Sequence, residues 1–170
     1  TRPARTGERE GTDYYFLGEE AFDEKLFEGE FLEHARVHQG QQYGTLRSTV
    51  EEAMMAGHDV LMDIDVQGAS QIRSWMKTIS PDDPLANSLV DVFILPPSMR
   101  VLGYRLRERG QDGDEAIAQR LQKADEELSQ AEDYAYCLVN DDLDRSCEVV
   151  RAIVLAEHHR VRESGKRHVS

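Results

Sequence analysis

Two arginines and two tyrosines in the first third of the chain have side chains that suit a compact anion. They are Arg2, Arg5, Tyr14 and Tyr43. Arginine presents a planar fork of N–H donors that binds phosphate oxygens in pairs, and a phenol hydroxyl can donate to the same oxygens. Basic residues close to a chain end are usually just solvated, so this group is weak evidence when it is taken alone.

A pair of carboxylates ends a largely apolar run of residues. Asp63 and Asp65 close the segment 59–65, and the alternation of a strand would place both on one face. Two like charges resist burial unless a cation or the donors of a ligand compensate them. The pair therefore suggests a binding site, although an isolated pair of this kind is more often a strand end that turns into solvent.

Three arginines flank a glycine-containing break between two helical segments. Arg105 and Arg109 are four residues apart and share a helix face, and Arg120 follows the break at 110–113. Such helices suit a lid that closes over a polyphosphate and supplies positive charge to a transition state. The alternative is a charged outer face in which Glu108 and Asp114 are the partners.

Alternating strands and helices must position these groups. We expect strands at 13–17, 31–37, 59–65, 90–95 and 136–139. We expect helices at 19–28, 48–56, 68–77, 98–109 and 114–131, a last helix ending near 163, and a turn at 39–42. Ser48 and Glu51 have the spacing of a capping box. This order predicts an α/β fold with a central parallel sheet, preceded by a small mixed β subdomain.

Charge and composition exclude several classes of function. The net charge is −13, which argues against a surface that binds DNA or RNA. No apolar run approaches the length needed to span a bilayer. Cys137 and Cys147 lack the CxxC spacing, and we expect reduced thiols in a cytoplasmic protein. His158 and His159 point to different sides of a helix, which argues against a metal site built from them.

Eight short motifs, taken in order, closely resemble the guanylate kinase family. They are Thr1–Glu8, Gly11–Phe16, Phe31–Glu33, Tyr43–Thr45, Asp63–Gly68, Ile94–Ser98, Arg105–Gly110 and Val139–Asp142. No single motif would suffice, but eight in register leave little room for coincidence. The resemblance covers the chain up to its last helix.

The resemblance implies an acceptor site with two ends. The phosphate of GMP would be bound by Arg2, Arg5, Tyr14 and Tyr43. The guanine would be read by Glu33, Thr45 and Asp65. A carboxylate accepts from the N1–H and 2-amino donors of guanine, and a hydroxyl can donate to O6. Adenine lacks this donor pattern, so such a site would discriminate against AMP.

The resemblance also implies a donor side. Arg105, Arg109 and Arg120 would be lid arginines that meet the phosphates of ATP, and Asn140 would contact the adenine side. Asp63 would lie nearer the magnesium ion and the transferring group, with any contact to the metal made through water. The reaction would transfer the γ-phosphoryl group of ATP to GMP or dGMP, giving ADP and GDP. Mg²⁺ and the arginines would neutralise charge, with no covalent intermediate.

By resemblance, the fold is the P-loop kinase type with a parallel sheet core. Residues 1–46 would form the GMP-binding subdomain, 47–98 part of the core, 99–126 the lid, and 127–170 the rest of the core with the C-terminal helix. Expected ligands are ATP with Mg²⁺ and GMP or dGMP, without nucleic acid or membrane. A homodimer is an expected assembly.

The chain departs from the family pattern at its start. The family opens with a strand, a GxxxxGK loop followed by Ser or Thr, and a helix. Residues 1–170 contain no such loop, since the only Gly-Lys pair, at Gly165, is followed by Arg167. We expect a longer protein whose preceding residues carry this loop; residues 1–170 alone should bind GMP but transfer phosphate poorly or not at all. Gln42 stands where the family often has a tyrosine, and 74–88 carries an insertion.

Two other functions remain as alternatives. A guanylate-kinase-like binding module would use the site for GMP or a phosphopeptide without catalysis. The missing phosphate loop favours that reading, while the two aspartates and the lid arginines oppose it. A kinase for a different nucleoside monophosphate is the third hypothesis.

Overall fold

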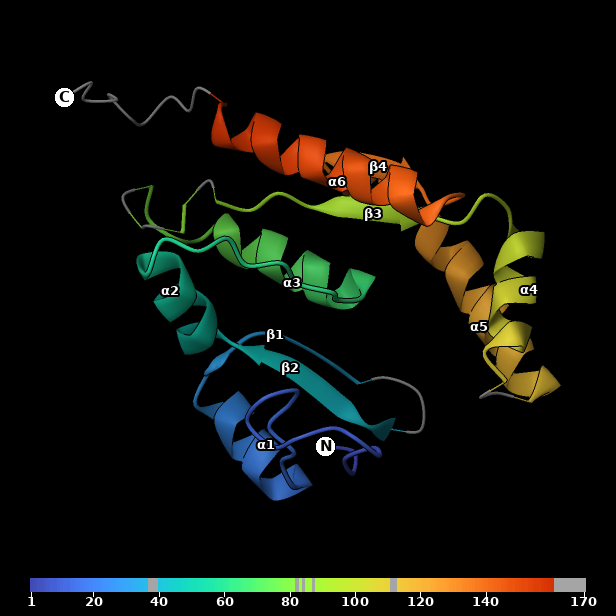
Figure 1. The fold of residues 1–170 in the computed structure, drawn as a ribbon. Helices are drawn as coiled ribbons and strands as arrows, with labels where there is room; N and C mark the ends of the chain where they lie inside the picture. The colour runs from blue at the N-terminus through green and yellow to red at the C-terminus, as the bar shows by residue number, and fades with distance from the viewer. Residues whose placement is uncertain (37–39, 82, 84, 87, 111–112, 161–170) are drawn as a thin grey trace. The chain divides into compact units, whose positions relative to one another are not determined.

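The computed structural model describes residues 1–36, 40–81, 83, 85–86, 88–110 and 113–160. The chain divides into two compact units, Thr1–Ala86 and Asn87–Ser170. Figure 1 labels the elements of both units. Each unit is described by itself below.

The first unit is built around an antiparallel hairpin. Its elements are α1 (Glu19–Phe27), β1 (Phe31–Arg36), β2 (Gln42–Leu46), α2 (Arg47–Met55) and α3 (Val66–Met76). The two strands pair with each other, and α3 packs against β1. Leu32, Val50 and Ile72 form a buried cluster to which β1, α2 and α3 each contribute one side chain.

An irregularity in β1 sets which side chains enter the site. Phe31 pairs with Leu46, but Glu33 pairs with Thr45, so Leu32 is the extra residue of a bulge. Both Leu32 and Glu33 are buried, although neighbouring strand residues normally face opposite sides. Leu32 joins the apolar cluster, while Glu33 lies directly opposite Thr45. Because of the bulge, the consecutive residues Leu32 and Glu33 are both buried, one in the core and one in the site.

The capping box predicted at Ser48 is wrong. Strand β2 runs directly into α2, whose N-cap is Leu46 and makes no side-chain cap bond. Ser48 lies inside the helix. The N–H of Arg47, at the first helical position, donates instead to the backbone oxygen of Glu30 at 2.9 Å. A backbone acceptor distant in sequence replaces the local cap.

Two predicted strands are absent from the first unit. The segment 13–17 contributes only an isolated bridge between Glu10 and Tyr14, and carboxylates of Glu10 and Asp13 accept N–H groups of the turn. The segment 59–65 is extended but pairs with no strand of the described residues. Leu61 in it is 88% exposed. An apolar run forms a strand only where a neighbour supplies backbone partners.

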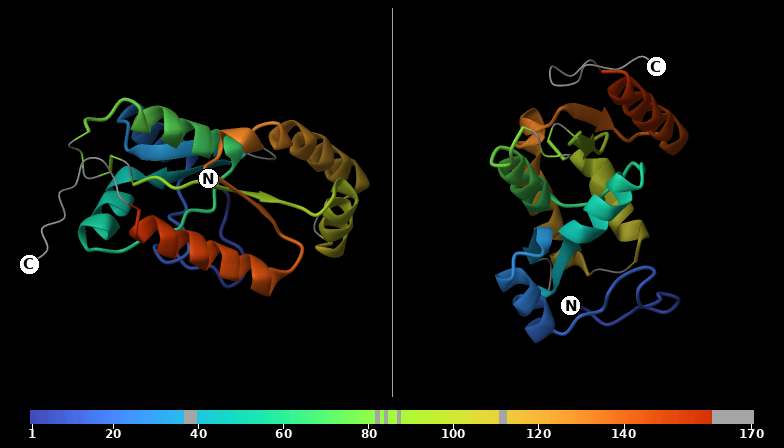
Figure 2. Two further views of the ribbon diagram at one scale, coloured as in Figure 1. Left: turned by 90° about the horizontal axis from the view of Figure 1, so that it is seen from above. Right: turned by 90° about the vertical axis from the view of Figure 1, so that its left-hand side faces the viewer.

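The second unit contains a parallel strand pair. It consists of β3 (Val92–Leu95), α4 (Met99–Glu108), α5 (Asp114–Leu128), a short 3-10 helix (Ala131–Asp133), β4 (Tyr136–Val139) and α6 (Leu143–His158). β3 and β4 pair in parallel, which confirms the predicted α/β class. α4 and α5 pack side by side, as Figures 1 and 2 show.

Most predicted elements are confirmed with shifted ends. The strand expected at 90–95 begins at Val92, and the helix expected to reach 163 ends at His158. Residues 161–163, Val37 and part of the turn at 39–42 lie outside the described residues. Gln42, expected in that turn, is the first residue of β2. The boundaries 1–46, 47–98, 99–126 and 127–170 stay predictions.

No helix in the described ranges has the length and apolar character needed to cross a membrane.

We predict that the core of the first unit depends on Ile72, which is 4% exposed. Ile72→Ala should lower the free energy of unfolding by about 2–5 kcal/mol, because it removes buried methyl groups and leaves a cavity. The exposed Leu61 provides the control, and Leu61→Ala should change stability by less than about 0.5 kcal/mol. Urea unfolding followed by circular dichroism measures both. Equal losses in the two variants would contradict this placement of the core.

Candidate functional site

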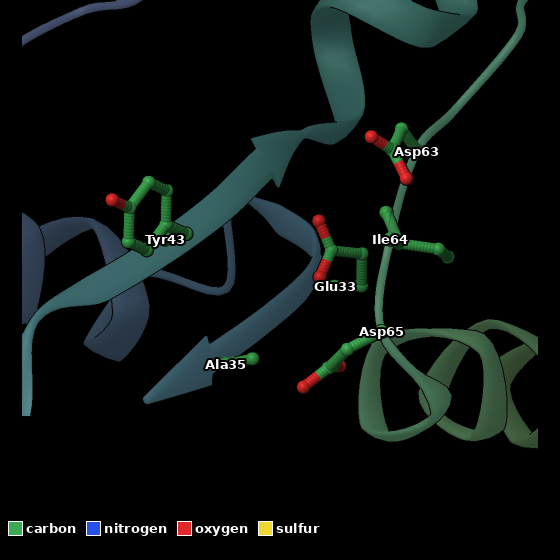
Figure 3. Close-up of a pocket in the computed structure, with 6 residues that line it drawn as sticks. All are labelled: Glu33, Ala35, Tyr43, Asp63, Ile64 and Asp65. Carbon is green, nitrogen blue, oxygen red and sulfur yellow. The ribbon is translucent and has the colours of Figure 1, made fainter. Parts of the chain in front are cut away.

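A pocket in the first unit brings several predicted site residues together. It has a volume of about 220 Å³ and is lined by Glu33, Ala35, Tyr43, Asp63, Ile64 and Asp65. Figure 3 shows the residues of β1 and β2 facing the segment that leads into α3. The segment 59–65, which belongs to no strand of the described residues, therefore still places Asp63 and Asp65 in this pocket.

Glu33 is the buried acid of this pocket. Its side chain is 6% exposed, and Oε1 accepts a hydrogen bond from the hydroxyl of Thr45 at 2.6 Å. Burial raises the pKa of Glu33 above its usual value; the Thr45 bond opposes this rise and the nearby Asp65 charge adds to it. The Thr45 hydroxyl donates to Glu33 here, so it has an acceptor before any ligand arrives.

Asp65 is fixed at the start of α3. Its Oδ1 accepts from the backbone N–H of Gly68 at 2.9 Å, which makes it the N-cap, and its Oδ2 accepts from Nε2 of Gln67 at 3.1 Å. A carboxylate at a helix N-terminus is stabilised by the free N–H groups there. The cap therefore holds Asp65 in place at the start of α3, where it lines the same pocket as Glu33.

Gly68 allows the helix to approach the buried acid. A Cβ at this position would lie 2.6 Å from Oε2 of Glu33, which is closer than real Cβ atoms come. The φ angle of Gly68 lies outside the left-handed region that favours glycine, so glycine is required here because a larger side chain would not fit. The first turn of α3 thus rests directly against the Glu33 carboxylate.

Arg2 lies in a network that adjoins the pocket. Its Nη1 and Nη2 donate to the two carboxylate oxygens of Glu8 at 2.6 and 2.5 Å, and Nε donates to the hydroxyl of Tyr43 at 2.9 Å. The guanidinium also lies 5.1 Å from the ring centroid of Tyr14. Arg2 is buried, at 8% exposure. Tyr43 therefore joins the arginine network to the acidic pocket that it lines.

Glu8 holds Arg2 in this position. The bond from Arg2, and then the backbone N–H of Arg5, lower the pKa of Glu8 to about 2. The pKa of Arg2 is raised by the same pair. With a further bond from Nη1 to the backbone oxygen of Pro3, only one N–H on Nη2 has no described acceptor. Arg5 is exposed, so its guanidinium is accessible to a ligand, whereas that of Arg2 is mostly occupied by hydrogen bonds within the protein.

The predicted lid arginines lie in the second unit. Arg105 donates to the backbone oxygens of Asn140 and Asp141 at 2.9 and 3.5 Å, and so joins α4 to the residues after β4. Arg109 is exposed at the C-cap of α4, and Arg120 is half-buried in α5. Arg105 and Asn140, both assigned to the ATP side, are therefore brought together.

Three residues that hold the site or its elements in place were not among the predicted site residues. Glu8 pairs with Arg2, and its position near two arginines could have suggested this role. Gln42 is buried and donates from Nε2 to Asp23 of α1 at 3.2 Å. Gln71 of α3 bonds to the backbone of His34 in β1. No local pattern indicates a role for either glutamine.

The described residues contain no group of three or more His, Cys, Asp or Glu side chains placed to hold a metal ion. Asp63 is exposed at the edge of the pocket. A single carboxylate there fits a metal that keeps most of its water ligands, as Mg²⁺ does.

Comparison with known proteins gives consistent matches. The family model described as guanylate kinase matches residues 1–157. A guanylate kinase from Rhodopseudomonas palustris (strain HaA2) is 47% identical over 157 residues, covering 92% of this chain and 67% of that relative. One from Nitrosospira multiformis is 42% identical over 168 residues, covering 99% and 75%. The crystal structure of guanylate kinase from Anaplasma phagocytophilum matches with a TM-score of 0.73 and 35% identity, covering 95% of this chain and 73% of that one.

We predict that Glu8→Gln destabilises the first unit in a pH-dependent way. The native pKa of Glu8, about 2, lies below that of an unfolded glutamate, roughly 4.3. Its stabilisation is thus present above the unfolded pKa and is lost as the pH falls through the native one. The melting temperature of Glu8→Gln should lie below wild type at pH 7, and the gap should narrow between about pH 4 and pH 2. A gap that is constant with pH would contradict the ion pair, and the exposed Glu52→Gln is the control.

Proposed function

Because the chain belongs to the guanylate kinase family, we propose that the pocket of the first unit is the site where GMP binds. The protein is a nucleoside monophosphate kinase that transfers the γ-phosphoryl group of ATP to GMP. The observation that carries the proposal is the pairing of a buried acid, Glu33, with a capped one, Asp65, next to an arginine network.

The acidic end of the pocket suits guanine. Glu33 and Asp65 supply acceptors for the N1–H and 2-amino donors, and the Thr45 hydroxyl can turn toward O6 once the ligand's donors occupy Glu33. Burial of Glu33 makes an unpaired carboxylate costly, so a base without matching donors binds poorly. This supports selection of guanine over adenine.

The phosphate end is organised by Arg2 and completed by Arg5. Arg2 fixes the Tyr43 hydroxyl and offers one remaining N–H on Nη2. Arg5 is exposed and can close on the phosphate, together with the exposed Tyr14. We assign direct phosphate binding chiefly to Arg5, Tyr14 and Tyr43, with Arg2 as the fixed member of the group.

On the donor side we propose that Arg105, Arg109 and Arg120 meet the ATP phosphates, and that Asn140 lies at the adenine. Mg²⁺ bound with ATP would neutralise the phosphate oxygens, with Asp63 reaching it through water. Arg109 is exposed and can approach a ligand without breaking a described bond. The acceptor phosphate of GMP is already an oxyanion, so positioning and charge neutralisation suffice and no strong general base is needed.

The test is a coupled assay on the full-length protein with ATP, Mg²⁺ and GMP, with ADP and GDP as measured products. Turnover is expected. GMP binding without turnover would instead support the non-catalytic binding module, and phosphorylation of AMP at equal efficiency would support a kinase for another base.

We predict that Glu33→Gln and Asp65→Asn each reduce the preference for GMP over AMP, measured as the ratio of kcat/KM values. Each variant replaces an acceptor with a side chain that also donates, at the position of a guanine N–H. A loss of roughly 10- to 100-fold is expected for a hydrogen bond to a charged group. The exposed Glu52→Gln is the control. An unchanged preference in both site variants would refute the assignment of the base end.

We predict different kinetic effects for the arginines of the two units. Arg5→Ala should raise KM for GMP roughly 10- to 100-fold, because it removes a charged bond to the acceptor phosphate. Arg109→Ala should mainly lower kcat, by roughly 100-fold, since charge in the transition state is its proposed contribution. The exposed Arg9→Ala and Arg100→Ala are the matched controls. A KM effect from Arg109→Ala without loss of kcat would contradict its role.

A further inference from the structure

Gln71 bonds to both backbone groups of one strand residue. The N–H of His34 donates to Oε1 of Gln71 at 3.1 Å, and Nε2 of Gln71 donates to the backbone oxygen of His34 at 2.7 Å. A neighbouring strand makes this kind of reciprocal pair in a sheet. β1 pairs only with β2 among the described strands, so Gln71 supplies the partner that the other edge of β1 lacks.

This contact connects the two guanine-reading acids. His34 is the residue after Glu33, and Gln71 lies on the helix that Asp65 caps. Because α3 is a continuous helix from Val66 to Met76, fixing Gln71 on β1 also fixes its N-terminus. The separation of the two carboxylates is therefore set by one short backbone link and one rigid helix.

The close approach at Gly68 makes the distance between α3 and the Glu33 carboxylate sensitive to small movements of the helix. The site where a Cβ would stand is 2.6 Å from Oε2 of Glu33, so the helix lies against the carboxylate with no spare room. Two like charges in this pocket repel, and a free helix would relax by moving away from β1. The reciprocal bond at Gln71 opposes that movement.

We propose that Gln71 is a positioning residue for base recognition, which holds Glu33 and Asp65 at the spacing that guanine requires. This inference rests on the proposed GMP site. Gln71 itself is not expected to touch the ligand, because its amide is occupied by the backbone of His34.

The test compares Gln71→Met, which keeps length and removes both bonds, with Ser74→Met on an exposed position of the same helix. Steady-state kinetics of the full-length protein should show KM for GMP raised roughly tenfold in Gln71→Met, the size expected for losing one or two neutral hydrogen bonds. The preference for GMP over AMP should fall, while KM for ATP and kcat stay within about twofold. Ser74→Met should resemble wild type.

A second variant tests the bond to the His34 oxygen. Gln71→Glu keeps an acceptor for the His34 N–H but sets a carboxylate oxygen against the His34 backbone oxygen, so its KM for GMP should rise at least as far as that of Gln71→Met. An unchanged KM for GMP with a lowered melting temperature, or equal losses for ATP and GMP, would overturn the inference and leave a structural role. Absence of GMP turnover in the wild-type protein would overturn the proposed function and this inference together.

Discussion

The structure of the first unit depends on burying the carboxylate of Glu33 beside a second acid. Burial raises the pKa of Glu33, and the hydroxyl of Thr45 offsets only part of the cost of a charge out of water. The bulge at Leu32 makes this burial compatible with an apolar core, because it turns two consecutive residues into buried positions with different neighbours. Hydrogen bonds from the N–H donors of a ligand to this carboxylate offset the free-energy cost of burying it.

The arginine end of the site follows the opposite arrangement. Arg2 is neutralised by Glu8 before any ligand binds; its Nε donates to the Tyr43 hydroxyl, and one N–H on Nη2 has no described acceptor. The pocket is thus lined by acids, and Tyr43 joins it to the network of Arg2. A ligand with N–H donors at one end and a phosphate at the other has one favourable orientation in such a field.

The sequence predicts those elements whose signals are local. Helix α3 was predicted at 68–77 and begins two residues earlier, at Val66, and β3 and β4 lie in short apolar runs that were predicted as strands. The run 59–65 has the same apolar character but pairs with no strand of the described residues, which periodicity cannot reveal. The capping box predicted at Ser48 does not form, because the backbone oxygen of Glu30 accepts the N–H of Arg47 at the start of α2 instead. Several residues predicted for the site line one pocket. Gln71 bonds to another element and gave no signal in the sequence, and Gln42 departed from the family pattern without indicating its bond to Asp23.

The partners of the arginines explain which of them stay fixed and which are available to a ligand. Arg2 makes two charge-assisted hydrogen bonds to the carboxylate of Glu8. A phosphate would make bonds of similar strength, so replacing Glu8 by a ligand phosphate would gain little free energy. Arg105 donates to two neutral carbonyl oxygens, and a phosphate oxygen is a stronger acceptor than either. Arg5 and Arg109 are exposed, so under the proposed function each would meet a ligand without giving up a partner of comparable strength. Under the proposed function, charge for the transferring group would therefore come most readily from the arginines that the folded chain holds weakly, while Arg2 stays paired with Glu8.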